Sequence, residues 1–265
     1  MRDSFGREIT YLRVSVTDRC NMRCIYCMPA EGVPLLAHED ILTFEQIEAI
    51  VRAAVGLGIE KVRLTGGEPL VRKGILELVR MLGRIEGLHT LAMTTNGSLL
   101  APLAQDLAAG GLTSVNISLD SLDPVRFERI TRIGRLSDVL AGIDAALSSG
   151  LAVKLNMVVL EDTPASEIEA LRQYAKSRGA GFQTIAHYSL SEEKRDDYAY
   201  DRPPPCSRCN RIRLLANGVL RPCLHSDTDI PVDFDNIEES LKKAILAKPA
   251  HGMVSSAIAV SQIGG

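Results

Sequence analysis

Short runs of apolar and β-branched residues alternate with longer amphipathic stretches over the first 190 residues, and this alternation restricts the possible folds more than any other feature. Six runs are typical of buried strands: Tyr11–Asp18, Lys61–Gly66, Thr90–Asn96, Ser114–Asp120, Val153–Leu160 and Phe182–Leu190. The intervening stretches have helical spacing: Phe44–Leu57, Gly74–Ile85, Leu99–Ala109, Leu136–Leu147 and Pro164–Arg178. Strands that alternate with helices pair in parallel through right-handed crossovers. We therefore expect an α/β fold, a partial TIM-type barrel of six (β/α) units or a doubly wound sheet, with chemistry at the C-terminal strand ends.

The alternation stops after Leu190. The segment 191–205 is charged and then rich in proline, which predicts a linker. Beyond it, Ile212–Ala216 and Val219–Cys223 flank Asn217-Gly218 and predict a hairpin, and Ile237–Ala247 predicts a helix. The expected division is residues 1–190, a linker over 191–205, and a C-terminal extension over 206–265.

Composition narrows the class of protein. The net charge of −3 provides no overall basic field for nucleic acid. No apolar run reaches the roughly 20 residues of a membrane span. The first residues include no apolar segment typical of a secretory signal, so a cytoplasmic protein is expected.

The six cysteines form two groups: Cys20, Cys24 and Cys27, then Cys206, Cys209 and Cys223. With an ample core and no export signal, ligation of metal or cluster is favoured over disulfides. In the first group, three thiolates can hold three irons of a 4Fe–4S cluster and leave the fourth iron open. The alternatives are zinc or a redox disulfide. The second group has its own alternative, a zinc ribbon completed by His225.

The spacing Cys20-x3-Cys24-x2-Cys27, with Tyr26 before the last cysteine, resembles the radical S-adenosylmethionine (SAM) superfamily. The resemblance implies that the open iron binds SAM and that one electron breaks its sulfonium bond to give a 5′-deoxyadenosyl radical. Further positions resemble those that contact SAM in this superfamily: Gly66, Gly67, Glu68, Thr94, Thr95 and Ser118. Each of these also has an ordinary explanation as a turn or cap residue.

Further motifs resemble one family within the superfamily, the GTP 3′,8-cyclases of molybdenum cofactor biosynthesis. They are Tyr11-Leu12-Arg13-Val14-Ser15-Val16-Thr17-Asp18-Arg19-Cys20-Asn21, Val115-Asn116-Ile117-Ser118-Leu119-Asp120-Ser121-Leu122, Lys154-Leu155-Asn156-Met157, Cys209-Asn210-Arg211-Ile212-Arg213-Leu214, Leu220-Arg221-Pro222-Cys223-Leu224 and the Gly264-Gly265 end. The implied reaction is hydrogen abstraction from C3′ of GTP, after which C3′ attacks C8 of guanine. The product is 3′,8-cyclo-7,8-dihydro-GTP.

The resemblance also implies roles for residues. The six cysteines would hold two 4Fe–4S clusters, and the open iron of the second would bind guanine. Catalytic arginines would line the cavity (Arg13, Arg211 and Arg213), and cations would contact the triphosphate (Lys61, Arg63 and Lys154). Gly264 and Gly265 would enter the site. The structural alternatives are solvated strand-end charges and a frayed terminus. The implied partners are a flavodoxin-type or other reductase as electron donor and a downstream pyranopterin-forming enzyme.

The chain departs from the family before the second cysteine group. The family pattern has roughly sixty more residues there, on the scale of a barrel domain, and the sixth strand differs. We transfer no contacts to that strand, where His187 and Tyr188 either line the pocket or pack as ordinary residues. Two other hypotheses stay open: a two-cluster radical SAM enzyme acting on another nucleotide or a peptide, and a non-enzymatic protein that holds zinc or senses a cluster.

Overall fold

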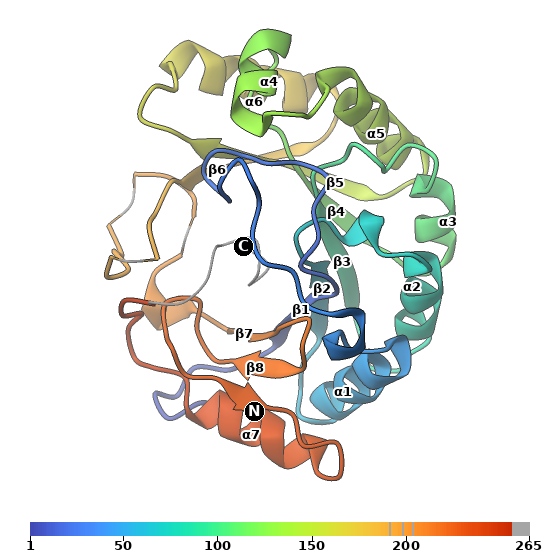
Figure 1. Cartoon of the computed structure of the whole chain (residues 1–265), viewed down its shortest axis with the longest axis vertical. Coiled ribbons are helices and arrows are strands. Elements are labelled where there is room, and N and C mark those ends of the chain that lie inside the picture. The colour runs from blue at the N-terminus through green and yellow to red at the C-terminus, as the bar shows by residue number, and fades with distance from the viewer. Residues whose placement is uncertain (191, 198, 203, 256–265) are drawn as a thin grey trace.

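The computed structural model describes residues 1–190, 192–197, 199–202 and 204–255, and one nine-stranded sheet organises this part of the chain. The sheet has the order β6-β5-β4-β3-β2-β1-β7-β8-β9. Its strands are β1 Tyr11–Ser15, β2 Lys61–Thr65, β3 Thr90–Thr95, β4 Ser114–Ser118, β5 Ala152–Val159, β6 Gly181–Ala186, β7 Arg211–Leu214, β8 Val219–Arg221 and β9 Ile230–Pro231. The seven strands from β6 through β1 to β7 pair in parallel with their neighbours. Strand β8 pairs antiparallel with both β7 and β9. The sheet curves around an open interior with helices outside it (Figure 1), so the expected α/β partial barrel is confirmed.

The helices cover the outer face of the sheet. They are α1 Phe44–Gly56, α2 Ile75–Gly83, α3 Ala104–Ala109, α4 Pro124–Thr131, α5 Leu136–Ser148, α6 Ala165–Ser177 and α7 Ile237–Leu246. Helix α1 begins with a capping box, because Thr43 and Gln46 exchange side-chain and backbone hydrogen bonds. No helix among the described residues is long and apolar enough to cross a membrane.

The strands place apolar and polar side chains on opposite faces of the sheet. Leu12, Val14 and Leu64 are fully buried and belong to the hydrophobic core, whereas Arg13 and Arg63 alternate with them and face the interior. Burial of each such leucine or valine contributes roughly 1.5–3 kcal/mol. The apolar core thus lies between the sheet and the helices, and the inner face of the sheet carries polar residues.

Two helices differ from the sequence prediction. Helix α4 was not predicted, although Asp123 caps it by accepting from the amide of Val125 at 2.9 Å and Pro124 fills its first position. Helix α3 is shorter than the predicted Leu99–Ala109. Three-residue turns precede it, in which the amide of Leu100 donates to the carbonyl of Gly97 and that of Leu103 to the carbonyl of Leu100.

The C-terminal strands continue the same sheet. The predicted hairpin is present as β7 and β8, and Gly218 supplies the positive φ of 81° in its turn. Strand β7 pairs in parallel with β1, in a register that sets Arg211 beside Tyr11 and Arg213 beside Arg13. Residues about 200 positions apart thus line the same interior. The division at residues 190 and 205 stays a prediction.

Candidate active site

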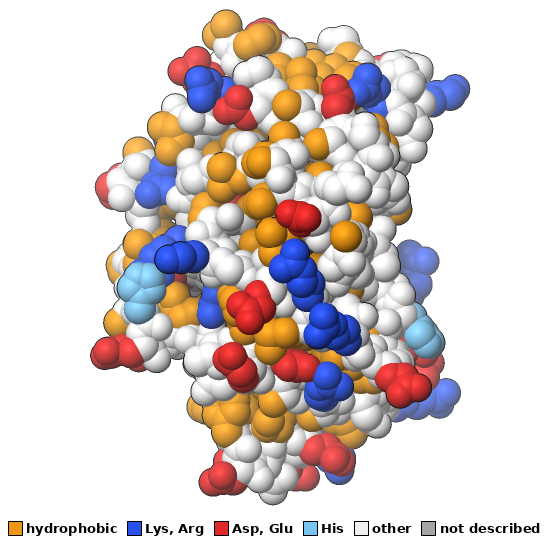
Figure 2. Space-filling view, turned by 90° about the vertical axis from the view of Figure 1, so that its right-hand side faces the viewer, with side chains coloured by type: hydrophobic (Ala, Val, Ile, Leu, Met, Phe, Trp, Pro, Cys, Tyr) orange, Lys and Arg blue, Asp and Glu red, His pale blue; other side chains and the backbone are white. Residues whose placement is uncertain are grey.

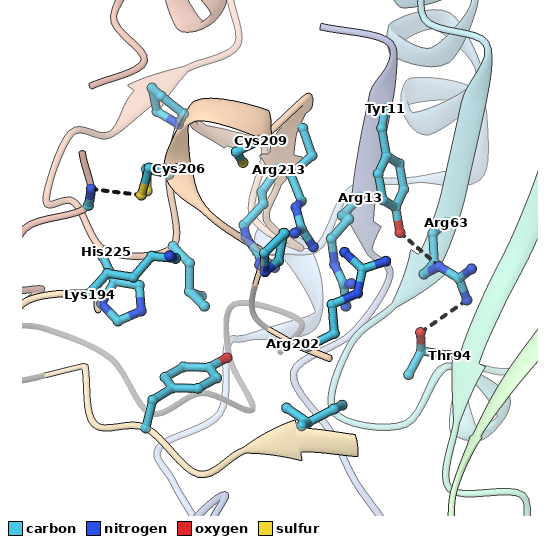
Figure 3. A pocket seen from close by; sticks show the side chains of 18 of the residues that line it. Tyr11, Arg13, Arg63, Thr94, Lys194, Arg202, Cys206, Cys209, Arg213 and His225 are labelled. Atoms are coloured by element: carbon cyan, nitrogen blue, oxygen red, sulfur yellow. Dashed lines mark hydrogen bonds between the residues drawn. The ribbon is translucent and has the colours of Figure 1, made fainter. Parts of the chain in front are cut away.

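A cavity inside the curved sheet is lined by alternate residues of neighbouring strands (Figure 3). Because successive side chains of a strand point to opposite faces, lining residues two positions apart share the inner face. The strand residues that line the cavity are Tyr11, Arg13, Lys61, Arg63, Thr94, Asn116, Lys154, Asn156, Gln183, Ile185, Arg211 and Arg213. The sheet curvature brings all of them to one space.

Three arginines lie in register across the middle of this wall. Arg13 on β1 pairs with Arg63 on β2 on one side and with Arg213 on β7 on the other. Their exposed fractions are 9%, 5% and 5% respectively. Like charges directly opposite each other destabilise a sheet, and burial adds a desolvation cost. This arrangement concentrates positive charge on the inner wall, and an anion bound in the cavity would offset it.

Tyr11 lies in the adjacent row, between Lys61 and Arg211. Its hydroxyl accepts a hydrogen bond from Nε of Arg63 at 2.8 Å. Burial by itself raises the pKa of Tyr11, but the surrounding cations, Arg13 first, lower it to about 8. Burial also lowers the pKa of Arg13 to about 9, with Arg213 and Arg211 acting in the same direction, so Arg13 stays charged at pH 7.

The charge of the cavity has one sign. None of the described residues that line it is Asp or Glu. The ten Lys and Arg side chains of the lining are Arg7, Arg13, Lys61, Arg63, Lys154, Lys194, Arg202, Arg211, Arg213 and Lys248. On an outer face, by contrast, acidic and basic side chains are interspersed (Figure 2), and the whole chain carries a net charge of −3. The cavity therefore concentrates positive potential for an anion.

The first cysteine group lies in the loop that follows β1. The loop is fixed to α4, because the amides of Arg23 and Ile25 donate to the carbonyls of Thr131 and Ile130 at 3.1 and 2.9 Å. Arg132, at a positive φ of 67°, donates to two more loop carbonyls. Cys20, Cys24 and Cys27 form no disulfide and are of intermediate burial. The helix that sequence analysis missed thus holds the cysteine loop in place.

Glu68 lies at the end of β2, close to this loop. Its carboxylate accepts from the amides of Leu70 and Asn96 at 3.0 and 2.7 Å and from the hydroxyl of Thr95 at 2.8 Å. Burial raises its pKa to about 7, although these hydrogen bonds oppose the rise. The carboxylate is thus held in one orientation and titrates near neutrality.

Gly66 and Gly67 precede Glu68. A Cβ on Gly66 would lie 2.5 Å from the carbonyl oxygen of Thr17, and one on Gly67 2.4 Å from that of Arg19. Both approaches are far too close for any side chain. The two glycines therefore let the backbone after β2 pack directly against the backbone that leads into the cysteine loop.

Tyr26 and Asp120 join the loop to β4. The hydroxyl of Tyr26 donates to Oδ2 of Asp120 at 2.7 Å, and Oδ1 accepts from the amide of Val158 at 2.8 Å. Burial raises the pKa of Asp120 to about 6. Thr94 lines the cavity whereas Thr95 bonds to Glu68, as strand alternation requires. Ser118, the last residue of β4, is partly buried.

The second cysteine group lies at the cavity itself, and Cys206, Cys209 and Cys223 all line it. The 3-10 helix η3 (Cys206–Arg208) carries the first, and the amide of Gly252 donates to its Sγ at 3.4 Å. Burial acts to raise the pKa of Cys209, but the charges of Lys248 and Arg211 lower it to about 7. A thiol of this kind is readily deprotonated, as a cluster or metal ligand must be.

Lys248 is almost completely buried beside these thiols. Its ammonium donates to the carbonyls of Arg211 and Pro222, each at 2.9 Å. His225, the suggested fourth zinc ligand, packs its ring against Tyr188 with centroids 5.4 Å apart. Among the described residues, the group of His, Cys, Asp and Glu atoms within 4.8 Å of one another is Asp196, Cys206 and His251, without His225.

Most residues singled out in the sequence converge. The structure brings the predicted cations, the second cysteine group and Thr94 to one cavity, and the SAM-type residues to the strand ends beside the first cysteine loop. Tyr188 lines the cavity, whereas His187 is exposed. Gly264 and Gly265 lie outside the described residues. Sequence analysis missed Lys194, Arg202 and Lys248, since no motif or periodicity marks them.

Comparisons with known proteins agree with this geometry. The model of the radical SAM superfamily matches residues 14–175. A curated GTP 3′,8-cyclase of Alkaliphilus oremlandii is 40% identical over 320 positions that cover 100% of both chains. One from Thermodesulfovibrio yellowstonii is 40% identical over 94% of each chain, and one from Peptoclostridium acidaminophilum 43% identical over 86% of this chain and 84% of its own.

Solved structures share the fold at low identity. SuiB of Streptococcus suis bound to S-adenosylmethionine has a TM-score of 0.70 at 15% identity, over 92% of this chain and 65% of that one. An anSMEcpe structure with bound AdoMet has a TM-score of 0.64 at 16% identity, over 91% and 78%. The chain therefore spans slightly less than two thirds of the length of SuiB.

Proposed function

The chain belongs to the radical SAM superfamily and, within it, to the GTP 3′,8-cyclases, and from that premise we propose how its residues divide the reaction. Radical SAM enzymes use an iron–sulfur cluster and SAM. When bound, these would supply a 5′-deoxyadenosyl radical able to take H3′ of GTP; formation of the C3′–C8 bond would leave a radical on the guanine, which one further electron from an external donor and one proton would convert to the 7,8-dihydro product. The protein contributes the binding, the orientation and the shielding of the reacting groups.

The first cysteine group fits a cluster that keeps one iron open. Cys20, Cys24 and Cys27 lie in one loop and form no disulfide, and three thiolates would leave the fourth iron for a non-protein ligand. Glu68 would accept from the ammonium of SAM, and its own amide bonds to Arg19, which directly precedes the cysteine loop. Gly66, Gly67, Thr94, Thr95, Ser118 and Tyr26 complete the proposed SAM site.

The arginine row is the observation that carries the substrate assignment. Arg13, Arg63 and Arg213 are buried side by side, and an anion with several oxygens would offset the charge of all three together. A triphosphate suits forked guanidinium donors. Lys61, Lys154 and Arg211 extend the same wall.

We assign a second 4Fe–4S cluster to Cys206, Cys209 and Cys223. The three cysteines line the same cavity as the arginine row, and the low pKa of Cys209 favours the thiolate. An open iron there would face the guanine while the triphosphate meets the arginines. An external one-electron donor would reduce the first cluster, and a second enzyme would convert the cyclic nucleotide to a pyranopterin.

The charge of the cavity also helps to decide whether the substrate is a nucleotide or a peptide. A lining of ten Lys and Arg residues without a described carboxylate suits a polyanion. Peptide recognition commonly uses sheet edges, apolar grooves or aromatic pockets instead. The nucleotide assignment is therefore favoured.

Turnover tests the assignment. Reduced, anaerobically reconstituted protein with SAM and GTP deuterated at C3′ should form 3′,8-cyclo-7,8-dihydro-GTP and deuterated 5′-deoxyadenosine. Such material should contain about eight irons, as two 4Fe–4S clusters require, and Cys206→Ala should halve that number. Arg13→Gln should lower kcat/KM at least roughly tenfold, the scale of one lost charged hydrogen bond.

The matched control is Arg52→Gln. Arg52 pairs with Glu48 on the exposed side of α1, so its loss should leave turnover unchanged. Absence of cyclised nucleotide from fully reconstituted wild-type protein would exclude the assignment. Deuterium transfer from a different nucleoside triphosphate would move it to that nucleotide.

A further inference from the structure

The segment between β6 and the second cysteine group returns along the edge of β6. Ile185 and Arg202 form a parallel bridge there, and the amide of Ala186 donates to the carbonyl of Arg202 at 2.9 Å. The segment therefore follows the sheet edge where it approaches Cys206, rather than passing over open solvent.

A carboxylate fastens the segment at this point. Oδ2 of Asp201 accepts from both the amide and the hydroxyl of Thr184, each at 2.8 Å. The amide of Asp201 returns a bond to the same hydroxyl at 3.3 Å. Thr184 is buried in β6 with 5% exposure. These hydrogen bonds, here called the Asp201–Thr184 clamp, therefore attach the segment to a well-packed strand. The backbone amide of Thr184 holds the pKa of Asp201 below its usual value, which keeps the clamp charged.

The Asp201–Thr184 clamp positions the neighbouring residue, Arg202, at the cavity wall. Arg202 is half-buried and lines the same space as the arginine row, and its side chain lies beside Arg13 in Figure 3. Burial lowers the pKa of Lys61, and the charge of Arg202 acts in the same direction. No described carboxylate lies within 4.0 Å of its guanidinium, because Asp201 bonds to Thr184 instead. An additional cation that forms no salt bridge among the described residues thus faces the proposed triphosphate site.

The chain is shorter than its relatives, and this bears on the position of Arg202. The alignment with the A. oremlandii enzyme has 320 positions and this chain has 265 residues, so at least 55 positions lie opposite gaps in it. The family resemblance puts the shortening between β6 and Cys206. The remaining segment lines the cavity at Lys194, Arg202 and Pro204, and next to Arg202 it is fastened to β6.

We propose that the short segment is part of the substrate site: Arg202 binds the polyphosphate of the nucleoside triphosphate, and Asp201 positions it through Thr184. This inference rests on the proposed function and adds to it a residue outside every motif of the family. Asp201 touches no substrate in this account and acts only through Arg202.

The experiment combines turnover with binding of inorganic tripolyphosphate, which needs no chemistry. Arg202→Gln should raise KM for GTP and the Kd for tripolyphosphate roughly tenfold, with kcat changed less than about threefold, because a ground-state charged hydrogen bond is lost. Arg202→Lys should recover part of the affinity. Arg195→Gln is the control, since Arg195 lies in the same segment and pairs with Asp197 in solvent.

Asp201→Asn tests the positioning role. It should weaken tripolyphosphate binding in the wild-type background and have no added effect in Arg202→Gln, whereas a general loss of structure would weaken both. Unchanged Kd and KM in Arg202→Gln, beside weakened binding in Arg63→Gln, would overturn the inference and leave the proposed function intact. Failure of the proposed function shows instead as wild-type protein that binds tripolyphosphate but forms no cyclised nucleotide.

Discussion

Burial gives Glu68 a pKa of about 7 in the SAM-free protein. A carboxyl whose pKa is raised by folding is protonated in the folded state over a range where the unfolded chain is already ionised. The stability that protonated Glu68 contributes is therefore present below about pH 4.5 and lost as the pH rises through about 7. An ammonium bound at Glu68 reverses this preference, because it needs the ionised form.

SAM affinity should consequently depend on pH. At pH 6 the affinity of the reconstituted enzyme for SAM should be about tenfold lower than at pH 8, since roughly one Glu68 in ten is then ionised. Equilibrium binding of SAM at the two pH values measures the effect. In Glu68→Gln the affinity should be low and equal at both, and equal affinities in the wild type would remove Glu68 from the SAM site.

Cys209 supports a second prediction for a single residue. With a pKa of about 7, half of this thiol is ionised at pH 7 in cluster-free protein, whereas burial raises the pKa of Cys20, Cys24 and Cys206. Iodoacetamide should therefore alkylate Cys209 before those three cysteines, as peptide mass spectrometry would record. Lys248→Met should slow that reaction several-fold because it removes the largest favourable charge. An equal rate in both proteins would assign the reactivity to exposure alone.

At the level of elements, glycines let α5 lie directly on the turn after β3. A Cβ on Gly142 in α5 would lie 2.3 Å from the carbonyl oxygen of Gly97. That turn follows Asn96, whose amide bonds to Glu68. The fit of one helix thus bears on the geometry of the proposed SAM site.

Gly142→Ala should lower the free energy of unfolding by roughly 1–3 kcal/mol, the usual cost of overpacking. Gly56→Ala is the matched control. Gly56 is also helical, at the end of α1, with nothing within 4 Å of an added Cβ, so the change should stabilise by about 0.5 kcal/mol through helix propensity. Urea unfolding of both variants measures the contrast, and a shift of the same sign in the two would contradict the packing argument.

The sequence predicted the elements that carry their own local signal. The six predicted strands are present, and Asn217-Gly218 located the hairpin, but β1 ends at Ser15 rather than Asp18 and β6 at Ala186 rather than Leu190. Helix α4 was not predicted because its eight residues give a weak periodic pattern, although Asp123-Pro124 marks its start. The pairing of β7 with β1 could not be derived from local pattern, since the two strands are distant in sequence.

For the whole molecule, motifs located the predicted site and tertiary contacts added to it. The predicted cations share one wall because strands place alternate residues on one face. Arg202 and Lys248 depend instead on where the chain returns after β6 and after α7. The path to Arg202 rests on the Asp201–Thr184 clamp, which no spacing in the sequence indicates.

The charge distribution of the whole molecule leads to the last prediction. The chain carries a net charge of −3, yet its cavity concentrates ten Lys and Arg side chains. Ligand at about a hundred times its Kd adds about 2.7 kcal/mol to the free energy of unfolding. Inorganic tripolyphosphate at that level should therefore raise the unfolding temperature by roughly 5–10 °C, given about 2–4 °C per kcal/mol for a chain of this size.

Salt and a pair of variants separate cavity binding from general anion effects. The rise should shrink as ionic strength increases from about 50 to 200 mM, because exposed phosphate oxygens are then screened. Arg63→Gln should lose most of the rise, since Arg63 is buried in the arginine row. Arg178→Gln should keep it, because Arg178 pairs with Asp144 on the outer surface. Calorimetry of the three proteins with and without tripolyphosphate gives the comparison, and an undiminished rise in Arg63→Gln would place the anion outside this cavity.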